Sequence, residues 1–399
     1  MLLSENRNSY SQLSTLMSET RVELLMLSNM LNKGGAERFA STLLVHLDRT
    51  RFKPALCLLR KDIGYPLPDD VPFGVLEYHR PVHFFRAVRG LRGLIEQLQP
   101  DVVLSNGAAT GMVTGMALRR CRADPAWIAR IDNNPRYHDT GLRRLILKRA
   151  YRRAKSFVVN SRGVLNDLVA CYPFTKNKTQ VVMNPADFAR IDALAQQPPA
   201  QQAAPDVPVA IAVGRLFPQK RIDLLIDAFA RVLQGLRAEL WICGDGPERH
   251  KLERKVAHLT LGPNVRILGH CPNPFALMRQ AAVYVLSSDY EGLPNALIEA
   301  QGLGLPAVAT RCPHGPEEII DDGKTGLLTP VGDPRELAEA MAKILSNEPR
   351  RRQMGQLAKL HARRLFDASH LVRGWERVIM ECRRAGPGGR PGLGRRGGS

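Results

Sequence analysis

Residues 281–300 read AAVYVLSSDYEGLPNALIEA, and the expected fold of the second half of the chain follows from this stretch. Its first part, 281–286, is a short apolar and partly β-branched run, typical of a buried parallel strand. Residues 296–303 are good helix formers, and Gly304 and Pro306 end the expected helix. The stretch therefore predicts a loop between the carboxyl end of a parallel strand and the start of a helix.

The predicted loop suits a bound anion. Gly292 frees the backbone, and Pro294 fits the first turn of a helix. The unpaired N–H groups of a helix start, together with the helix dipole, favour an anion such as a diphosphate. Glu291 and Glu299 would stand near the same ligand, and because like charges repel, we expect them to accept hydroxyl groups of a sugar or a ribose. Two Glu eight residues apart indicate nothing by themselves, since a surface helix with a Glu in its first turns is common.

The whole string 291–299, EGLPNALIE, resembles the Glu-x7-Glu signature of the family-4 retaining glycosyltransferases, which have the GT-B fold. The resemblance extends over roughly residues 22–380. It implies an α/β protein with two doubly wound, Rossmann-like domains that face each other across a cleft. In the family the first Glu contacts the donor sugar and the second holds the nucleoside ribose, roles that the resemblance gives to Glu291 and Glu299. It also places the intervening loop against the donor: Gly292, Leu293, Pro294 and Asn295.

Length and composition set broad limits. The chain has 399 residues, enough for two domains, and no apolar stretch approaches the ~20 residues that span a bilayer. The polar N-terminus does not resemble a signal peptide, so we expect a cytoplasmic protein. The seven cysteines show no paired spacing, which argues against a disulfide framework or a structural zinc site. The net charge of +19 indicates an acidic partner, such as nucleic acid, anionic lipid or a phosphorylated substrate.

A glycine pair follows the first predicted strand, 22–28, and precedes a helix that we expect to run through Leu47. Gly34 and Gly35 let the backbone approach a phosphate, or form a plain tight turn. A Gly-Gly-Ala-Glu-Arg loop at this place is also common in the family, which favours a donor-binding role. Strands and helices then alternate and predict a doubly wound parallel sheet. The further strands are expected at 53–59, 75–78, 101–105, 127–131 and 157–160.

Asp132 lies at the carboxyl end of one of these strands, where α/β proteins bind ligands. In many family members a His or Arg occupies the position that we align with Asp132, so this sequence departs from the pattern. As a catalytic candidate, Asp132 could accept the proton of the acceptor hydroxyl or merely position that hydroxyl. His138 is a lone loop histidine and is expected to be a bystander.

Residues 143–155 carry seven cations with four apolar side chains among them. This pattern predicts either a basic amphipathic helix on an anionic membrane or a solvated basic helix with its apolar side in the core. A second basic helix is expected at 84–98. Nucleic acid fits the charge alone, because no aromatic-rich or helix-turn-helix signature supports it. The cations expected to face a membrane are Arg144, Lys148, Arg152 and Arg153.

The second domain opens with a strand that ends at Gly214 and is followed by Arg215 and Lys220 before a helix. Two cations at one strand end can clamp a diphosphate, or form surface ion pairs. The string resembles the family's Gly-Arg-Leu…Lys-Gly loop, so Arg215 and Lys220 are assigned to the donor phosphates; Arg221 replaces the usual Gly. The resemblance places Gly269 beside the nucleobase. No Asp-x-Asp pair is present, and we expect neither a metal nor any other cofactor.

The expected division of the chain is an unfolded extension over 1–20, an acceptor-side domain over 21–192, a linker over 193–207 and a nucleotide-sugar-binding domain over 208–365. A helix over 366–382 returns to the first domain with Trp375 packed between them, and a basic tail over 383–399 has no fold.

The sequence thus predicts a retaining glycosyltransferase that moves a hexose or N-acetylhexosamine from a nucleotide diphosphate sugar, with UDP preferred over GDP, to a lipid-linked or lipopolysaccharide-type acceptor. We expect it to lie on the inner face of the cytoplasmic membrane. The alternatives are a sugar phosphorylase or hydrolase on the same fold, and a non-catalytic binding protein at a membrane or on nucleic acid.

Overall fold

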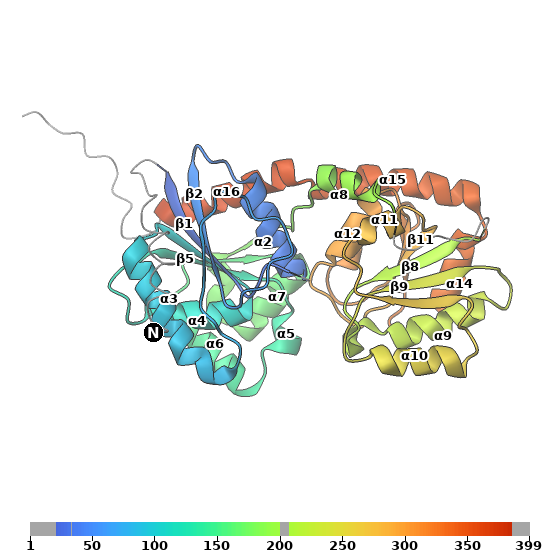
Figure 1. Ribbon diagram of the computed structural model, residues 1–399, viewed down its shortest axis with the longest axis horizontal. Helices are drawn as coiled ribbons and strands as arrows, with labels where there is room; N and C mark the ends of the chain where they lie inside the picture. Colours follow the sequence, from blue (N-terminus) through green and yellow to red (C-terminus); the bar gives the residue numbers. More distant parts are fainter. Residues whose placement is uncertain (1–20, 33, 200–206, 385–399) are drawn as a thin grey trace, which may run out of the picture. The chain divides into compact units, whose positions relative to one another are not determined.

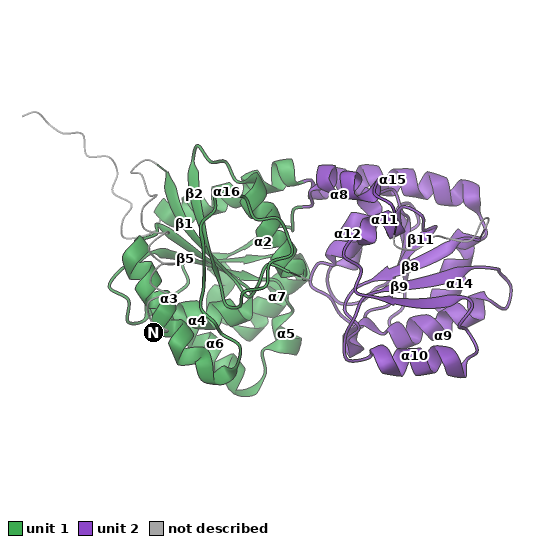
Figure 2. Cartoon of the chain, viewed as in Figure 1, with its two compact units in different colours: residues 1–185, 368–399 green, residues 186–367 purple. Residues whose placement is uncertain are grey.

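The computed structural model of the protein describes residues 21–32, 34–199 and 207–384 (Figure 1). These residues form two compact units (Figure 2). The first unit extends to Pro185 and includes the chain again from Ala368, whereas the second runs from Ala186 to Asp367. Residues 1–20 and 385–399, expected to lack a fold, and residues 200–206 of the expected linker lie outside the described residues.

Seven parallel strands form the sheet of the first unit, in the order β3-β2-β1-β4-β5-β6-β7. The chain winds outward in both directions from the neighbours β1 and β4, as a doubly wound sheet does. Short apolar runs buried on both faces explain why these segments form parallel strands. The bounds are β1 (Val22–Ser28), β2 (Phe52–Leu58), β3 (Phe73–Val75), β4 (Val102–Asn106), β5 (Ala126–Ile131), β6 (Ser156–Val159) and β7 (Thr179–Val181).

Helices cover both faces of this sheet. One apolar core joins the sheet to α3, α4, α6 and α7, and another joins its opposite face to α2 and α16. The bounds are α2 (Gly35–His46), η1 (Pro81–His83), α3 (Phe84–Leu98), α4 (Ala108–Leu118), α5 (Pro135–His138), α6 (Gly141–Tyr151), α7 (Arg162–Cys171), η2 (Pro173–Lys178) and α16 (Ala368–Arg384).

Six parallel strands form the sheet of the second unit, in the order β10-β9-β8-β11-β12-β13. The winding reverses between β8 and β11, so the predicted pair of doubly wound parallel sheets is confirmed. The strands are β8 (Val209–Val213), β9 (Glu239–Cys243), β10 (Val265–Gly269), β11 (Val283–Leu286), β12 (Ala307–Thr310) and β13 (Gly326–Thr329). The helices are α8 (Phe188–Ala195), η3 (Pro218–Lys220), α9 (Ile222–Val232), α10 (Arg249–His258), α11 (Pro274–Met278), α12 (Asn295–Gly302), α13 (Pro316–Ile319), α14 (Pro334–Leu345) and α15 (Glu348–Phe366).

The boundary between the units differs from the expected linker at 193–207. Helix α8 belongs to the second unit, because Asp192 forms an ion pair of 2.6 Å with Arg363 of α15. The ring of Phe188 also lies against Gly302 of α12, where a larger residue would collide with it. A Gln- and Pro-rich composition therefore marks the segment after α8, whereas the chain passes between units at Pro185 and again at Asp367.

Trp375 of α16 is fully buried in the first unit. Its ring lies 4.7 Å from the ring of Phe39 on α2, measured between centroids. On the same helix, Glu376 is buried; it accepts a hydrogen bond from the Asp48 amide at 2.9 Å and pairs with Arg51 at 3.2 Å. The C-terminal helix is thus an integral part of the first unit's core, and it continues to Arg384, two residues into the expected tail.

Replacing Trp375 with Ala should destabilise the protein by about 3–5 kcal/mol, because a large buried side chain is lost and a cavity remains. The matched control is Arg377→Ala, an exposed position on the same helix. Urea unfolding followed by tryptophan fluorescence and circular dichroism measures both variants. Equal midpoints for the two would contradict the assigned role of α16.

Candidate functional site

The strand order of the second sheet reverses between β8 and β11, and the loops after these two strands meet at its carboxyl edge. Such a reversal point is where open α/β sheets bind ligands. The loop after β8 covers 214–221 and the loop after β11 covers 287–294. Both loops were singled out by the sequence, and they are neighbours because their strands pair directly.

Backbone and side-chain hydrogen bonds join the two loops. The amide of Asp289 donates to the carbonyl of Gln219 at 2.9 Å. The hydroxyl of Ser287 donates to the carbonyl of Lys220 at 2.8 Å. The position of each loop therefore depends on the other.

Lys220 and Glu291 form an ion pair across these loops, with 2.5 Å between Nζ and Oε1. The Glu291 side chain is 7% exposed and that of Lys220 is 19% exposed. The sequence assigned these residues to different parts of one donor, the phosphates and the sugar. The structure places them in direct contact.

The backbone conformation at Arg221 explains why the family motif usually carries Gly at this position. Its φ is +47°, in the left-handed region that favours glycine. Two ion pairs of 3.2 Å, with Asp223 and Asp289, hold the side chain. The hydrogen bond with Asp223 is the main cause of the raised pKa of Arg221. These contacts offset the backbone strain, so the loop keeps its turn without the glycine.

Arg215 is exposed, and its guanidinium lies over the ring of Phe217 at 4.9 Å. Among the described residues no carboxylate pairs with Arg215. An exposed guanidinium with no acidic partner is available to an anionic ligand.

The loop after β11 ends at Pro294, which precedes the first residue of α12, Asn295. Gly292 and Leu293 lie just before this helix start, so the predicted donor-binding residues of the loop lie together. Glu299 is 3% exposed within α12. Burial chiefly, with the charges of Glu291 and Glu299, raises the pKa of Tyr284. The negative charges of both carboxylates therefore disfavour ionisation of the same buried phenol.

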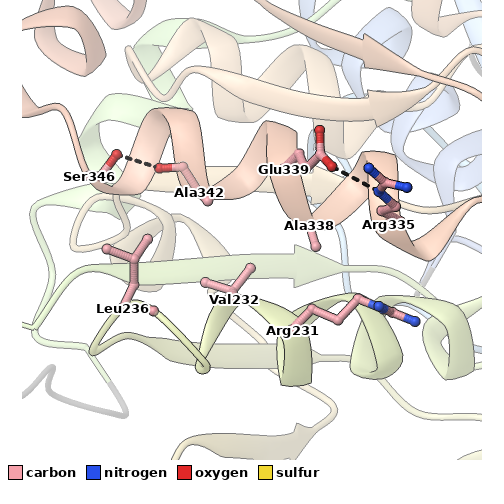
Figure 3. A pocket seen from close by; sticks show the side chains of 9 residues that line it. Arg231, Val232, Leu236, Arg335, Ala338, Glu339, Ala342 and Ser346 are labelled. Carbon is pink, nitrogen blue, oxygen red and sulfur yellow. Dashed lines mark hydrogen bonds and ion pairs between the residues drawn. The ribbon is translucent and has the colours of Figure 1, made fainter.

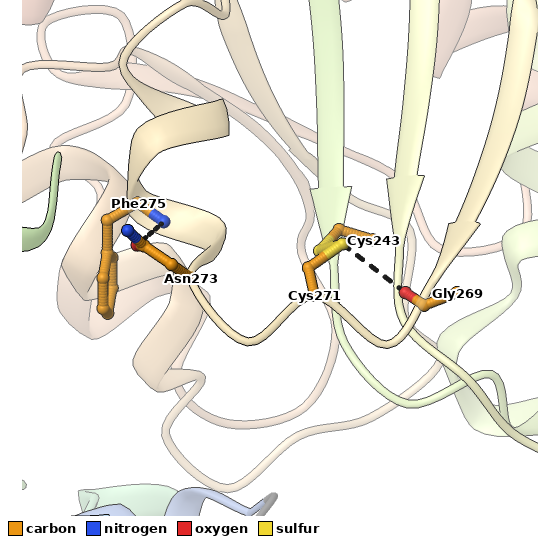
Figure 4. Close-up of a disulfide and its surroundings, with 5 residues drawn as sticks. All are labelled: Cys243, Gly269, Cys271, Asn273 and Phe275. Atoms are coloured by element: carbon orange, nitrogen blue, oxygen red, sulfur yellow. Dashed lines mark hydrogen bonds between the residues drawn. A yellow bond between two sulfur atoms is a disulfide. The ribbon is translucent and has the colours of Figure 1, made fainter. Parts of the chain in front are cut away.

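Gly269 ends β10 with a φ of +71° and lies against the guanidinium of Arg249. Its carbonyl accepts the amide of Gly244 at 2.7 Å, which ties the ends of β9 and β10 together. Next to it, Cys243 and Cys271 form a disulfide (Figure 4). The expectation that the cysteines do not pair is wrong for these two. Their 28-residue separation shows no local pattern, and only the adjacency of the two strands brings them together.

The first sheet reverses between β1 and β4; Gly34 lies in the loop after β1, and Gly35 is the first residue of α2. Asn106, the last residue of β4, donates from Nδ2 to the carbonyl of Ala36 at 2.8 Å and to Ser28 Oγ at 3.2 Å. The glycine pair is therefore at the predicted edge of the sheet. Its backbone at Gly34 is extended rather than left-handed.

Arg130 is a buried cation at this edge that the sequence analysis did not single out. It is 1% exposed, and burial lowers its pKa to about 10. Its two terminal nitrogens donate to Asn106 Oδ1 at 2.5 Å and to Asn184 Oδ1 at 2.8 Å. The guanidinium also lies 3.9 Å from the ring centroid of Phe39. An Arg inside the apolar strand AWIARI was the signal that could have revealed it.

Asp132 lies directly after β5, with its side chain 14% exposed. Its Oδ2 is 3.8 Å from Arg130, and its carbonyl accepts a hydrogen bond of 3.3 Å from Asn160. Gly107 stands beside the carboxylate with a φ of +95°. Asp132 is therefore a partly exposed carboxylate in the same polar cluster as Arg130 and Asn106. His138 is the last residue of α5.

Helix α6 has features of both predictions for the basic segment 143–155, an apolar side in the core and apolar side chains exposed beside cations. Leu147 and Tyr151 lie in the core, as ordinary packing requires, whereas Leu142 and Leu145 are 72% and 64% exposed. All four cations expected to face a membrane are exposed: Arg144, Lys148, Arg152 and Arg153. Arg153 also pairs with Asp124 at 2.9 Å. Leu142 and Leu145 are therefore the large apolar side chains of α6 that are exposed together with these cations.

Three further observations concern other pockets, metal sites and membrane-spanning helices. A surface hollow between α9 and α14 is lined by Arg231, Arg335, Glu339 and neighbouring residues, and it contains none of the residues assigned to the donor (Figure 3). Within 21–32, 34–199 and 207–384, no three His, Cys, Asp or Glu side chains gather where they could hold a metal ion. No helix in this part of the chain is both long and apolar enough to cross a membrane.

Comparison with known protein families gives two matches. The model of glycosyltransferase family 4 matches residues 33–190, and that of the glycosyl transferases group 1 matches residues 195–361. The two matches follow each other along the chain and together cover most of it. They correspond to a first part that holds Asp132 and a second part that holds the loops after β8 and β11.

Individual relatives agree with these matches. The chain is 28% identical to an uncharacterized glycosyltransferase of Methanocaldococcus jannaschii over 72% of this chain and 80% of that protein. It is 25% identical to the N-acetylgalactosamine-N,N'-diacetylbacillosaminyl-diphospho-undecaprenol 4-alpha-N-acetylgalactosaminyltransferase of Campylobacter jejuni, over 86% and 95% of the two chains. The structure of Anabaena HepE in complex with UDP superposes with a TM-score of 0.76 at 19% identity, over 90% of this chain and 100% of HepE.

Replacing Arg130 with Met should destabilise the protein by about 1–3 kcal/mol, because the buried acceptors Asn106 and Asn184 lose their donor. The control is Arg152→Met, which removes an exposed cation. Urea unfolding of the two variants measures the difference. An Arg130 variant as stable as the control would show that the buried guanidinium does not hold this edge together.

Proposed function

The chain belongs to family 4 of the glycosyltransferases, with the GT-B fold, and we propose that it is a retaining enzyme with a lipid-linked acceptor. In this proposal it moves a hexose or N-acetylhexosamine from a nucleotide diphosphate sugar to a hydroxyl group of a lipid-linked glycan or lipopolysaccharide-type acceptor. The observation that carries the donor assignment is the meeting of Arg215, Lys220, Glu291 and the start of α12 at one edge of the second sheet.

The donor diphosphate is assigned to Arg215, Lys220 and the N-terminus of α12. When the glycosidic bond breaks, the departing diphosphate gains negative charge. Two cations and a helix start that are already in place stabilise that charge without rearrangement. We propose that these groups take the place of a metal ion, and that the reaction needs neither a divalent cation nor another cofactor.

Glu291 is assigned to the sugar and Glu299 to the ribose. Glu291 already touches the cation assigned to the phosphate, so a sugar attached to that phosphate lies next to it. Glu299 lies eight residues further on, buried within α12. A ribose contact exists before and during reaction alike, whereas a contact with the transferred sugar changes as its bond breaks. Gly269, with its φ of +71°, is assigned to the nucleobase.

The acceptor is assigned to the first unit. Asp132 is a partly exposed carboxylate at the carboxyl edge, and we propose that it accepts a hydrogen bond from the acceptor hydroxyl. Gly34 and Gly35 lie at the same edge and are assigned to the donor's sugar or phosphate.

The chemistry of the relatives supports the choice of donor and acceptor. HepE was crystallised with UDP, which favours UDP over GDP. The Campylobacter relative is named for an undecaprenol diphosphate acceptor, which favours a polyprenyl-linked glycan in the assembly of bacterial surface polysaccharide. A water-soluble acceptor is the outcome that would argue against this choice.

A lipid-linked acceptor requires contact with a membrane, and we propose that the first unit provides it. Leu142 and Leu145 of α6 are exposed between cations; Val82 of η1 and Phe85 at the start of α3 are 79% and 75% exposed. Both helices begin at the carboxyl edge of a parallel sheet, the edge that holds Asp132. Apolar side chains and cations together favour the inner face of the cytoplasmic membrane, and no nucleic-acid partner is proposed.

The proposal is tested by incubating the enzyme with UDP- and GDP-sugars and measuring nucleotide diphosphate release with and without a polyprenyl diphosphate-linked acceptor. We expect release to depend on the acceptor and to persist when EDTA is added. Release of sugar phosphate with inorganic phosphate would indicate a phosphorylase. Loss of transfer with EDTA would contradict the metal-free assignment.

The two glutamates should separate kinetically. Glu299→Ala should mainly raise the donor KM, whereas Glu291→Ala should lower kcat, each by about tenfold to a hundredfold. Glu339→Ala, an exposed position on α14, is the control. Steady-state kinetics with varied donor measures both parameters, and the opposite pattern would mean that the two roles are exchanged.

Binding to vesicles that contain anionic lipid should fall as salt rises, because exposed charges are screened over about 10 Å at 0.1 M. The quadruple replacement of Arg144, Lys148, Arg152 and Arg153 by Gln should weaken sedimentation with vesicles and leave donor affinity unchanged. The control removes an equal charge from the second unit by Gln replacement of Arg335, Lys343, Arg350 and Arg352, all exposed. Equal loss in both variants would point to non-specific attraction, and no binding at low salt would refute the membrane assignment.

A further inference from the structure

Ser288 lies in the loop after β11, three residues before Glu291, and is fully buried. Its hydroxyl donates to Oε1 of Glu291 at 2.6 Å. Its own carbonyl accepts the hydroxyl of Thr310, from the neighbouring strand β12, also at 2.6 Å. Ser288 is thus fixed at both its backbone and its side chain.

Two donors meet at one oxygen of Glu291. The ammonium of Lys220 donates to the same Oε1 at 2.5 Å. The two donors differ in kind, because Lys220 is a cation on a flexible side chain that remains 19% exposed, whereas the Ser288 hydroxyl is neutral and buried. A carboxylate as buried as that of Glu291 requires such partners, since burial of an unpaired charge is costly.

A bound diphosphate changes the balance between these donors. Its negative charge attracts Lys220 and repels the carboxylate of Glu291. The contact of Lys220 with Glu291 is then shared with the phosphate. The contact from Ser288 is not shared, because a buried neutral hydroxyl is neither exposed to the ligand nor drawn by its charge.

We propose that Ser288 is a positioning residue that holds Glu291 against the donor sugar once the diphosphate has engaged Lys220. This inference rests on the proposed function and adds a residue to it. Without the hydroxyl, Glu291 would keep its place in the empty enzyme through Lys220 and lose it when the donor binds. The effect of Ser288 therefore belongs to the reacting complex rather than to the folded protein alone.

The test compares Ser288→Ala with Ser346→Ala, whose hydroxyl bonds the carbonyl of Ala342 on the exposed end of α14. Ser288→Ala should lower kcat about tenfold, the loss expected for one hydrogen bond to a charged group. The donor KM and the Kd for UDP (or for GDP, if GDP-sugars are the donors turned over) should stay within about threefold of the wild type, since the diphosphate contacts remain. Thermal melting of the free protein should match the Ser346 control.

A double-mutant cycle identifies the route of the effect. If Ser288 acts through Glu291, then Ser288→Ala should cost little in a Glu291→Gln background, because interacting residues are not additive. A tenfold loss of kcat in both backgrounds, or a loss no larger than that of Ser346→Ala, overturns the role of Ser288 and leaves the proposed function standing. A wild type that turns over no nucleotide sugar overturns the proposed function and this inference together.

Discussion

The contact between Lys220 and Glu291 is the constraint on which the arrangement of the second unit's site depends. A carboxylate that is 7% exposed needs a compensating cation, and Lys220 supplies it from the neighbouring loop. The same two loops are joined by backbone hydrogen bonds, so the charge pair and the backbone hold one geometry. In that geometry Lys220 lies beside Glu291, in the loop that leads into the helix start of α12, where an anion is favoured.

In the first unit the buried charge is a cation, Arg130, and polar neighbours compensate for its burial. Arg130 is buried where β4 and β5 end; its two terminal nitrogens donate to two asparagines, whereas its Nε has no hydrogen-bond partner among the described residues. Asp132 forms an ion pair with Arg130 at the longer distance of 3.8 Å. The edge that holds the acceptor candidate is therefore a connected polar cluster at the end of the sheet.

The sequence was misleading at positions where the local residue pattern predicts one environment and the contacts in the folded chain give another. The Gln- and Pro-rich segment looked like the domain boundary, yet the ion pair of Asp192 with Arg363 keeps α8 in the second unit. Cys243 and Cys271 are 28 residues apart and meet because β9 and β10 pair. In the basic helix, the apolar residues divide between core and surface, a division that depends on which side of α6 faces the sheet.

The sequence alone determined the fold class and singled out most of the residues that meet in the candidate site of the second unit. Alternating apolar runs and helices give parallel sheets, and strand–loop–helix strings place Gly214, Arg215, Lys220 and Glu291 at strand ends, because parallel strands present their carboxyl ends at one edge. Only the tertiary structure decided which of these side chains touch. The pairing of Lys220 with Glu291, the hydroxyl of Ser288 on the same oxygen and the contacts of the buried Arg130 join residues up to 71 positions apart. Such contacts depend on strand order and register, which no local pattern of residues encodes.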